Sequence, residues 1–212
     1  FLRAKNIIID DTEHATFEQM IYKPFASLIL TPNTFKKDLG LRHCKINSTT
    51  DNLYLNPKYF KPDTSVLEKL SLDINSSYCI LRFVAWHATH DMGFSGFNRT
   101  QKIELIEQLS QYFCIFISTE GELPEEFDKY KFPLGSHEMH SALFYASLFI
   151  GESGTMATES AFLGTPSIMY NSSSKLFGVV DYFKSQRILF TPSTFNEIKF
   201  VVNEILSRPR EE

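Results

Sequence analysis

Residues 148–169 read LFIGESGTMATESAFLGTPSIM, and this stretch decides the fold class. It opens with a short apolar run, turns through small residues from Gly151 to Thr155, and continues at helical spacing before a second apolar run follows Pro166. A strand, a small-residue turn and a helix in this order are typical of a parallel sheet whose strands are joined by crossover helices. The stretch therefore predicts an α/β fold.

The same alternation extends in both directions along the 212 residues. Helices are predicted between the apolar runs, with start signals at Thr100, Ser136 and Ser193. Such connections predict a Rossmann-type, doubly wound parallel sheet. Runs with few polar residues predict strands covered by helices on both faces; they are Ile7–Ile9, Ser27–Leu30, Tyr78–Phe83, Phe113–Ile117, Leu148–Ile150, Pro166–Met169 and Ile188–Phe190.

A change of composition divides the chain in two. Pro57 and Pro62 form a connection before a predicted helix over Val66–Leu70. We place the boundary so that residues 1–65 carry the first few strands, and residues 66–212 carry a complete Rossmann-like unit. The chain has no initial Met and reaches its first strand almost at once. We therefore expect a piece of a longer protein, with a partial, N-terminally truncated first domain.

Charge and composition exclude two broad classes of function. The chain has 21 Lys+Arg against 25 Asp+Glu, a formal charge of -4, which argues against a nucleic-acid partner because a phosphate backbone requires a basic face. No apolar run approaches the roughly 20 residues that span a bilayer, so no membrane span is expected. The three cysteines form no close pair, which favours small buried side chains and a cytoplasmic location.

The turn after Leu148–Ile150 is the strongest candidate for chemistry. It leaves backbone N–H groups at a helix N-terminus, an arrangement that suits an anion such as a diphosphate. Ser153, Gly154 and Thr155 would contact this anion, and Glu159, one turn further, is placed to accept hydrogen bonds from ribose hydroxyls. The alternative is a plain strand-to-helix turn capped by Thr155.

A second candidate is the segment that follows the strand Tyr78–Phe83. Arg82, His87 and His90 would bind phosphate or transfer protons at the carboxyl end of a strand, where ligands bind in open α/β sheets. A structural loop and a metal site are the alternatives. The His87-x-x-His90 spacing has no third ligand in a defined place, so we predict no metal.

A third candidate is an acidic cluster directly after Ile7–Ile9. Asp10, Asp11, Glu13 and His14 would supply a general acid or base at the end of a strand. The alternative is a solvated loop that begins the next helix.

Weaker candidates for nucleotide binding lie further along the chain. Ser118 and Glu120 stand at another strand end, and His140 lies near the start of a predicted helix. A histidine at such a position is more often at the surface than catalytic.

Five stretches resemble, in order, a prokaryotic family of unknown function that is related to the GT-B superfamily. This superfamily includes the GT-B glycosyltransferases and the non-hydrolysing UDP-N-acetylglucosamine 2-epimerases. The resemblance covers almost the whole chain. It is carried by IIIDDTEHA, PFASLILTPNTFKKDLG, ILRFVAWHATHDMG, STEGELPEEF and IGESGTMATESAFLGTPSI.

The resemblance implies two Rossmann-like domains with a cleft between them, and a nucleotide sugar bound mainly to the C-terminal domain. Ser153, Gly154 and Glu159 match the epimerase pattern Ser-Gly-Gly-x-x-x-Glu, whose first residues hold the diphosphate and whose Glu holds the ribose. Thr155 departs from the second Gly. The loop with His87 falls where epimerases carry Gly-His-Arg-Arg, but the arginines are absent here.

The function implied by the resemblance is a metal-independent glycosyltransferase of cell-surface polysaccharide biosynthesis. Its substrate would be a UDP-linked sugar, with no further cofactor, and its acceptor a glycan or a lipid-linked glycan. A UDP-sugar epimerase and a non-catalytic nucleotide-sugar-binding module are the alternatives, and peripheral membrane association and a homodimer are both left open.

The resemblance also predicts how the candidate residues are arranged. Arg82 and the histidines His87 and His90 should line the same pocket as the Ser153 turn. The acidic cluster should face that turn across a gap too wide for direct contact.

Overall fold

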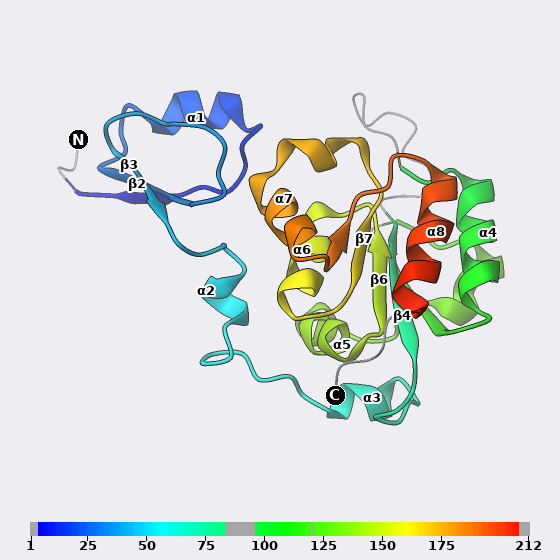
Figure 1. The fold of residues 1–212 in the computed structure, drawn as a ribbon. Helices are drawn as coiled ribbons and strands as arrows, with labels where there is room; N and C mark the ends of the chain where they lie inside the picture. The colour runs from blue at the N-terminus through cyan, green and yellow to red at the C-terminus, as the bar shows by residue number, and fades with distance from the viewer. Residues whose placement is uncertain (1–3, 84–95, 120, 208–212) are drawn as a thin grey trace.

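The computed structural model describes residues 4–83, 96–119 and 121–207, and its strands form two separate parallel sheets (Figure 1). The smaller sheet belongs to residues 4–64, which we call the N-terminal part. Its strands pair in the order β1-β2-β3, with Ile8 opposite Ile29 and Leu30 opposite Cys44. Their bounds are β1 (Ile7–Ile9), β2 (Leu28–Pro32) and β3 (His43–Ile46).

The second sheet has the order β5-β4-β6-β7-β8, with every pair parallel. Since β4 pairs with β5 on one side and β6 on the other, the winding reverses at β4, and ligands bind beyond the strand ends at such a point. Arg82 lies opposite both Ser118 and Gly151 there. The predicted α/β, doubly wound parallel sheet is confirmed. The strands are β4 (Tyr78–Phe83), β5 (Cys114–Thr119), β6 (Leu148–Gly151), β7 (Ser167–Met169) and β8 (Leu189–Phe190).

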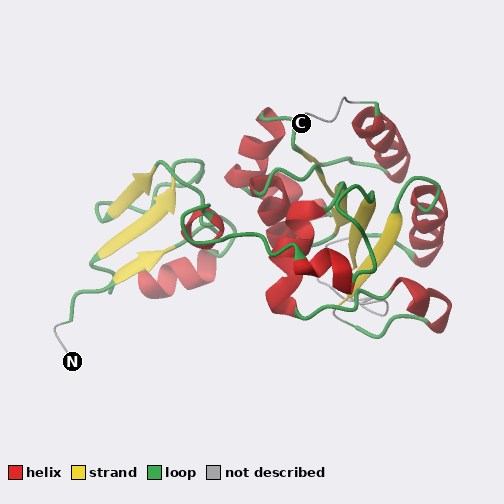
Figure 2. Cartoon of the chain, turned by 90° about the horizontal axis from the view of Figure 1, so that it is seen from below, coloured by secondary structure: helices red, strands yellow, loops and turns green. Residues whose placement is uncertain are grey.

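Helices cover both faces of the second sheet (Figures 1 and 2). Buried side chains of α4 and α8 form the core on one face, and those of α3, α5, α6 and α7 form the core on the other. The α-helices are α1 (Thr16–Tyr22), α2 (Asn52–Leu55), α3 (Ser65–Lys69), α4 (Arg99–Leu109), α5 (Met139–Tyr145), α6 (Gly154–Phe162), α7 (Gly178–Ser185) and α8 (Phe195–Leu206). Three 3-10 helices are η1 (Glu125–Tyr130), η2 (Ser136–Glu138) and η3 (Ser172–Leu176).

Side-chain caps define where three of these helices begin. The Asn98 side chain accepts from the Gln101 backbone N–H, and the Gln101 side chain accepts from the Asn98 backbone N–H. This capping box starts α4 just before the predicted Thr100. Ser153 caps α6, and Thr194 caps α8 one residue after the predicted Ser193. The starts of α4 and α8 thus differ from the predicted ones by one or two residues, as is usual at helix ends. At the predicted start Ser136 the chain forms the 3-10 helix η2 instead, and α5 begins only at Met139, with no side-chain cap.

The N-terminal part has a small apolar core. Its buried apolar cluster is Ala26, Ile29, Phe35 and Leu39, whereas Phe17 of α1 is 70% exposed. Among the described residues, no helix is both long enough and apolar enough to cross a membrane.

Candidate functional site

One face of α6 is turned toward the N-terminal part. Thr155, Thr158, Glu159 and Phe162 are three or four residues apart, which places them in one line along the helix. Each of them bonds to residues of the N-terminal part or lines a space shared with them. This stripe runs from the carboxyl edge of the second sheet along the junction between the two sheets.

A pocket of about 180 Å³ lies at the N-terminal end of the stripe, and we call it the α6 pocket. One wall is the first turn of α6 together with the start of α7. The opposite wall comes from the N-terminal part and contains two carboxylates. The lining residues are Asp11, Thr12, Thr50, Asp51, Tyr54, Gly154, Thr155, Thr158, Phe177, Val179 and Val180.

The α6 wall is suited to an anion. The Ser153 side chain accepts from the Met156 N–H at 3.4 Å, so Ser153 caps the helix, rather than Thr155. The first N–H groups of a helix have no acceptor within the helix, and the helix dipole makes this end partly positive. Gly154 and Thr155 supply the N–H groups nearest the pocket. Gly154 and Thr155 therefore line the α6 pocket, with Ser153 as the cap beside them. Their contact with an anion stays a prediction.

Asp51 is the carboxylate that the sequence reasoning missed. It is 3% exposed, and its Oδ1 accepts from the Thr158 hydroxyl at 3.4 Å. Burial raises the pKa of the Asp51 carboxyl to about 6, and the negative charge of Glu159 also raises it. A carboxyl with this pKa exchanges its proton near neutral pH, which is the property of a general base. The available signal was Asp51 at the end of the polar run NSTTD, residues 47–51, directly after β3.

Asp11 is the member of the predicted acidic cluster that lines the α6 pocket. Its Oδ2 accepts from the Thr50 hydroxyl and its Oδ1 accepts from the Thr12 hydroxyl at 3.0 Å. Asp10 instead accepts from the Thr12 backbone N–H, from Gln19 and from the Tyr22 hydroxyl. These bonds hold α1 against the end of β1.

Glu13 and His14 contact the start of α7 directly. Glu13 is 4% exposed, and its Oε1 accepts from the backbone N–H of Gly178, the first residue of α7, at 2.7 Å. The His14 ring meets Phe177 edge to face, with ring centroids 5.1 Å apart. These contacts are with the start of α7 and not with the Ser153 turn, which Asp11 faces across the α6 pocket. The gap between the acidic cluster and the Ser153 turn stays a prediction. The acid–base roles of Asp10, Glu13 and His14 stay predictions, and each side chain has another contact here.

Gly178 is required by this close approach. A Cβ at this position would lie 1.8 Å from the backbone oxygen of Thr34 and 2.9 Å from Glu13 Oε1. A separation of 1.8 Å from a backbone atom is far below van der Waals contact, so any side chain would push the N-terminal part away from α7.

Glu159 and His140 were both predicted to bind the nucleotide, and the structure brings them together. Glu159 is 8% exposed, its Oε1 accepts from the Tyr54 hydroxyl at 2.9 Å, and the same oxygen lies 3.1 Å from His140 Nε2. Burial, followed by the negative charges of Glu159 and Asp51, raises the pKa of Tyr54, so Tyr54 stays a donor. The ribose contact of Glu159 stays a prediction, and a ribose would have to replace Tyr54 there.

Arg82 and Ser118 line a second, larger pocket of about 690 Å³. Arg82 Nη1 donates to Ser118 Oγ at 2.7 Å. Arg82 does not line the α6 pocket, but the first turn of α6 borders both spaces, through Thr155 on one side and Met156 on the other. The lining residues are Arg82, Ile117, Ser118, Thr119, Gly121, Glu122, Leu123, Lys131, Phe132, Leu134, Ser136, Met139 and Met156.

Three predicted site residues, His87, His90 and Glu120, lie outside the described residues. Within residues 4–83, 96–119 and 121–207, no group of three or more His, Cys, Asp or Glu side chains is arranged to hold a metal ion. At the α6 pocket, the groups suited to an anion are backbone N–H groups and hydroxyls.

Comparison with known proteins gives a family and several distant structures. The model of the family described as "Protein of unknown function (DUF354)" matches residues 2–211, and no curated protein matches the sequence. E. coli heptosyltransferase WaaC with ADP is similar at a TM-score of 0.46 and 14% identity, covering 95% of this chain and 73% of that chain. The glycotransferase of kitacinnamycin (TM-score 0.45, 12% identity) is matched over 87% of this chain and 47% of its own length.

A third similar structure is the wall teichoic acid polymerase TagF, H548A, with a TM-score of 0.46 and 12% identity over 92% of this chain and 56% of that chain. The chain thus spans about half the length of two of these three proteins. At such identities and TM-scores the likeness bears on neither activity nor substrate.

Proposed function

Since this chain belongs to the family described as "Protein of unknown function (DUF354)", we propose its activity from the site itself: a GT-B-type glycosyltransferase that takes a UDP-linked sugar and transfers the sugar to an acceptor hydroxyl. The observation that carries the proposal is the α6 pocket. In it, a helix N-terminus faces Asp11 and Asp51 across a space of about 180 Å³.

The two walls match the two ends of a glycosyl transfer. The diphosphate leaves with the electrons of its bond to the sugar, and the N-terminus of α6 stabilises the charge that it gains. The acceptor oxygen forms the new bond to the sugar, and its proton passes to Asp51. A base with a pKa of about 6 is ionised at neutral pH and still basic enough to take that proton.

The remaining residues take positioning roles in this proposal. The pocket of about 690 Å³ beside Arg82 and Ser118 is large enough for the nucleoside, and pockets for small ligands have volumes of about 300–1,000 Å³. Asp11, held by the hydroxyls of Thr12 and Thr50, orients the acceptor. Glu13 fixes α7 against the N-terminal part.

The test of the anion site is a matched pair of substitutions at Thr155, which is exposed on the first turn of α6. Thr155→Glu places a negative charge beside the diphosphate, and Thr155→Gln is nearly the same size without the charge. An extra negative charge at a helix N-terminus does not destabilise the helix. Calorimetry with UDP, with and without a chelator, should show roughly tenfold weaker binding for Thr155→Glu and little change for Thr155→Gln. Equal UDP affinities in the two variants would exclude this anion site.

Turnover separates transfer from the alternatives. We expect the full-length protein to release UDP from a UDP-sugar only when an acceptor is present. Epimerisation of the sugar without any acceptor would instead identify an epimerase. UDP-sugar binding without either product would identify a non-catalytic module.

A further inference from the structure

A second space lies on the same face of α6, at the opposite end from the α6 pocket. It has a volume of about 320 Å³, and we call it the amide groove. One wall follows the carboxyl ends of β2 and β3, and the other is formed by the end of α6 and by α7. The lining residues are Asn33, Thr34, Asn47, Ser48, Thr49, Asn52, Phe162, Tyr182 and Phe183.

The lining of the amide groove carries no charged side chain. Asn33 Nδ2 donates to Asn47 Oδ1 at 2.8 Å, and Asn52 Nδ2 donates to Ser48 Oγ at 2.9 Å. Each neutral amide has two N–H donors and an oxygen that accepts twice, so these bonds use only part of its capacity. The bonds orient the amides and leave both donors and acceptors for a ligand.

An aromatic surface completes the groove. Tyr182 is 45% exposed, and its ring packs on that of the buried Phe183 with centroids 5.2 Å apart. Phe162, at the end of α6, is partly buried beside them. The two rings meet edge to face, and this contact holds the exposed Tyr182 ring in place as an apolar platform.

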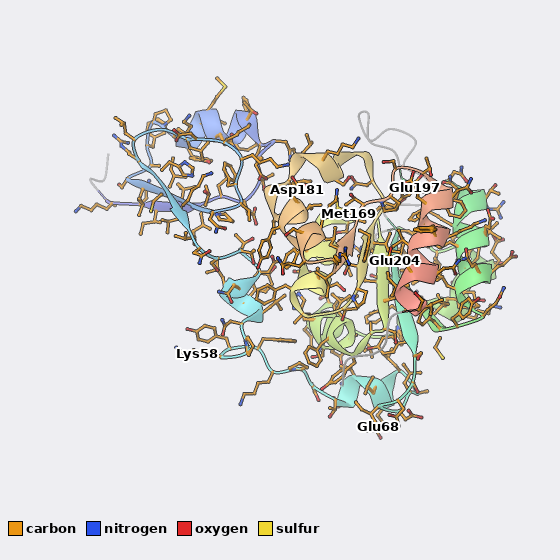
Figure 3. All side chains as sticks on the ribbon, viewed as in Figure 1. Lys58, Glu68, Met169, Asp181, Glu197 and Glu204 are labelled. Carbon is orange, nitrogen blue, oxygen red and sulfur yellow. The ribbon has the colours of Figure 1, made fainter. Side chains whose placement is uncertain are left out.

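An ion pair ties the two walls together. Lys36 Nζ lies 2.8 Å from Asp181 Oδ2 of α7, and it also donates to the backbone oxygen of Lys175 at 3.1 Å. Figure 3 labels Asp181 on α7. Asp181 is next in sequence to the lining residue Tyr182, and Lys36 is two residues from Thr34. The two charges pair with each other, so the groove itself stays electrically neutral.

We propose that the amide groove binds a neutral saccharide, as a sugar unit of the acceptor glycan; this rests on the proposed function. Sugar hydroxyls both donate and accept hydrogen bonds, as the amides do, and the C–H face of a sugar ring is apolar, as the aromatic platform is. An anionic ligand would require a cation, and an apolar ligand would leave the amides without partners. Phe162 lies seven residues beyond Thr155, roughly 10 Å along the helix, a distance that an oligosaccharide spans.

The test uses neutral trisaccharides of glucose, mannose, galactose or N-acetylglucosamine, and the same trisaccharides ending in glucuronic acid. Binding to the chain is measured by calorimetry or saturation-transfer NMR. We expect binding by at least one neutral trisaccharide and weaker binding by its acidic counterpart. Asn47→Ala should weaken it by roughly 2- to 12-fold for each hydrogen bond lost, and Tyr182→Ala should weaken it at least as much.

Tyr112→Ala is the matched control, because Tyr112 is 50% exposed, also packs beside a phenylalanine, Phe113, and lies outside the groove. Equal affinities in Tyr182→Ala and Tyr112→Ala, or no binding by any neutral trisaccharide, would overturn the inference. UDP affinity should be unchanged in Asn47→Ala and Tyr182→Ala. If UDP binds as expected and no saccharide does, the groove assignment fails while the proposed function stands. If the wild-type chain binds a saccharide but not UDP, the α6 anion site is rejected and the groove assignment stands.

Discussion

Asp51→Asn is expected to make the protein more stable and less active. The substitution keeps the shape of the side chain and an acceptor for Thr158, but it removes the ionisable carboxyl from a position that is 3% exposed. In the folded chain the pKa of Asp51 is raised from 3.8 to about 6, mainly by burial. The folded state therefore binds more protons than the unfolded state between about pH 4 and 6.

The sign and the size of the stability effect follow from this difference. As pH rises through that window, the free energy of unfolding of the wild type falls, and it levels off above pH 6. A pKa difference of about two units corresponds to about 3 kcal/mol, at 1.36 kcal/mol per unit. Asn has no proton to lose, so the free energy of unfolding of the Asp51→Asn variant does not fall between about pH 4 and 6. It should match the wild type near pH 4 and exceed its stability by up to about 3 kcal/mol at pH 7.5.

Urea unfolding at about pH 4.5 and 7.5 measures the effect. Asp63→Asn is the control, because the pKa of the exposed Asp63 is lowered by hydrogen bonds from the backbone and side chain of Ser65. That variant should be less stable than wild type at pH 7.5, the opposite sign. In the full-length protein Asp51→Asn should lower turnover by roughly 10²–10⁴-fold while UDP affinity is unchanged. A variant that gains no stability between the two pH values, or that turns over at the wild-type rate, would refute the reasoning.

Three further substitutions test contacts between the two sheets, all by urea unfolding. Glu13→Ala should destabilise the chain by about 1.5–3 kcal/mol, because the Gly178 N–H loses a charged acceptor. Glu13→Gln keeps an acceptor oxygen, so an equal loss of stability in the two variants would show that the hydrogen bond contributes little. Gly178→Ala should lower the free energy of unfolding by about 1–3 kcal/mol. Gly154→Ala should lower it less, because the new Cβ would meet only a flexible methionine methyl at 3.2 Å. Equal losses in the two variants would contradict the close approach at α7. Tyr54→Phe removes a donor to Glu159 and should cost about 1–3 kcal/mol, and an unchanged stability would indicate that water replaces the hydroxyl.

The sequence predicted the fold class well because strands buried on both faces read as nearly continuous apolar runs. The strand β3, with the sequence HCKI, was missed, since two of its four side chains are exposed and no apolar run marks it. Helix α7 was also missed, because no side chain of its own caps its first turn. Its cap is Glu13, which lies 165 residues away in the sequence.

The candidate site was predictable only where it depends on local structure. The Ser153 turn follows from a strand, small residues and a helix in succession, and the structure places it at the α6 pocket. The acidic cluster could not be sorted from sequence, because tertiary contacts decide which side chain faces the pocket. Asp10 is bonded within the N-terminal part and Glu13 to α7, which leaves Asp11. The polar run NSTTD marks Asp51 in the sequence, but the burial that raises its pKa depends on its contact with α6 and could not be predicted.

Four buried apolar residues hold the first sheet, whereas the second sheet has a large core on each face. The N-terminal part therefore opens at a lower free energy than the rest of the molecule. The α6 pocket and the amide groove each take one wall from it, so both exist only in the docked state. A ligand in either space shifts the equilibrium toward docking by RT ln(1 + [L]/Kd). Occupancy of one space then raises affinity at the other, a positive linkage between sites that share no residue.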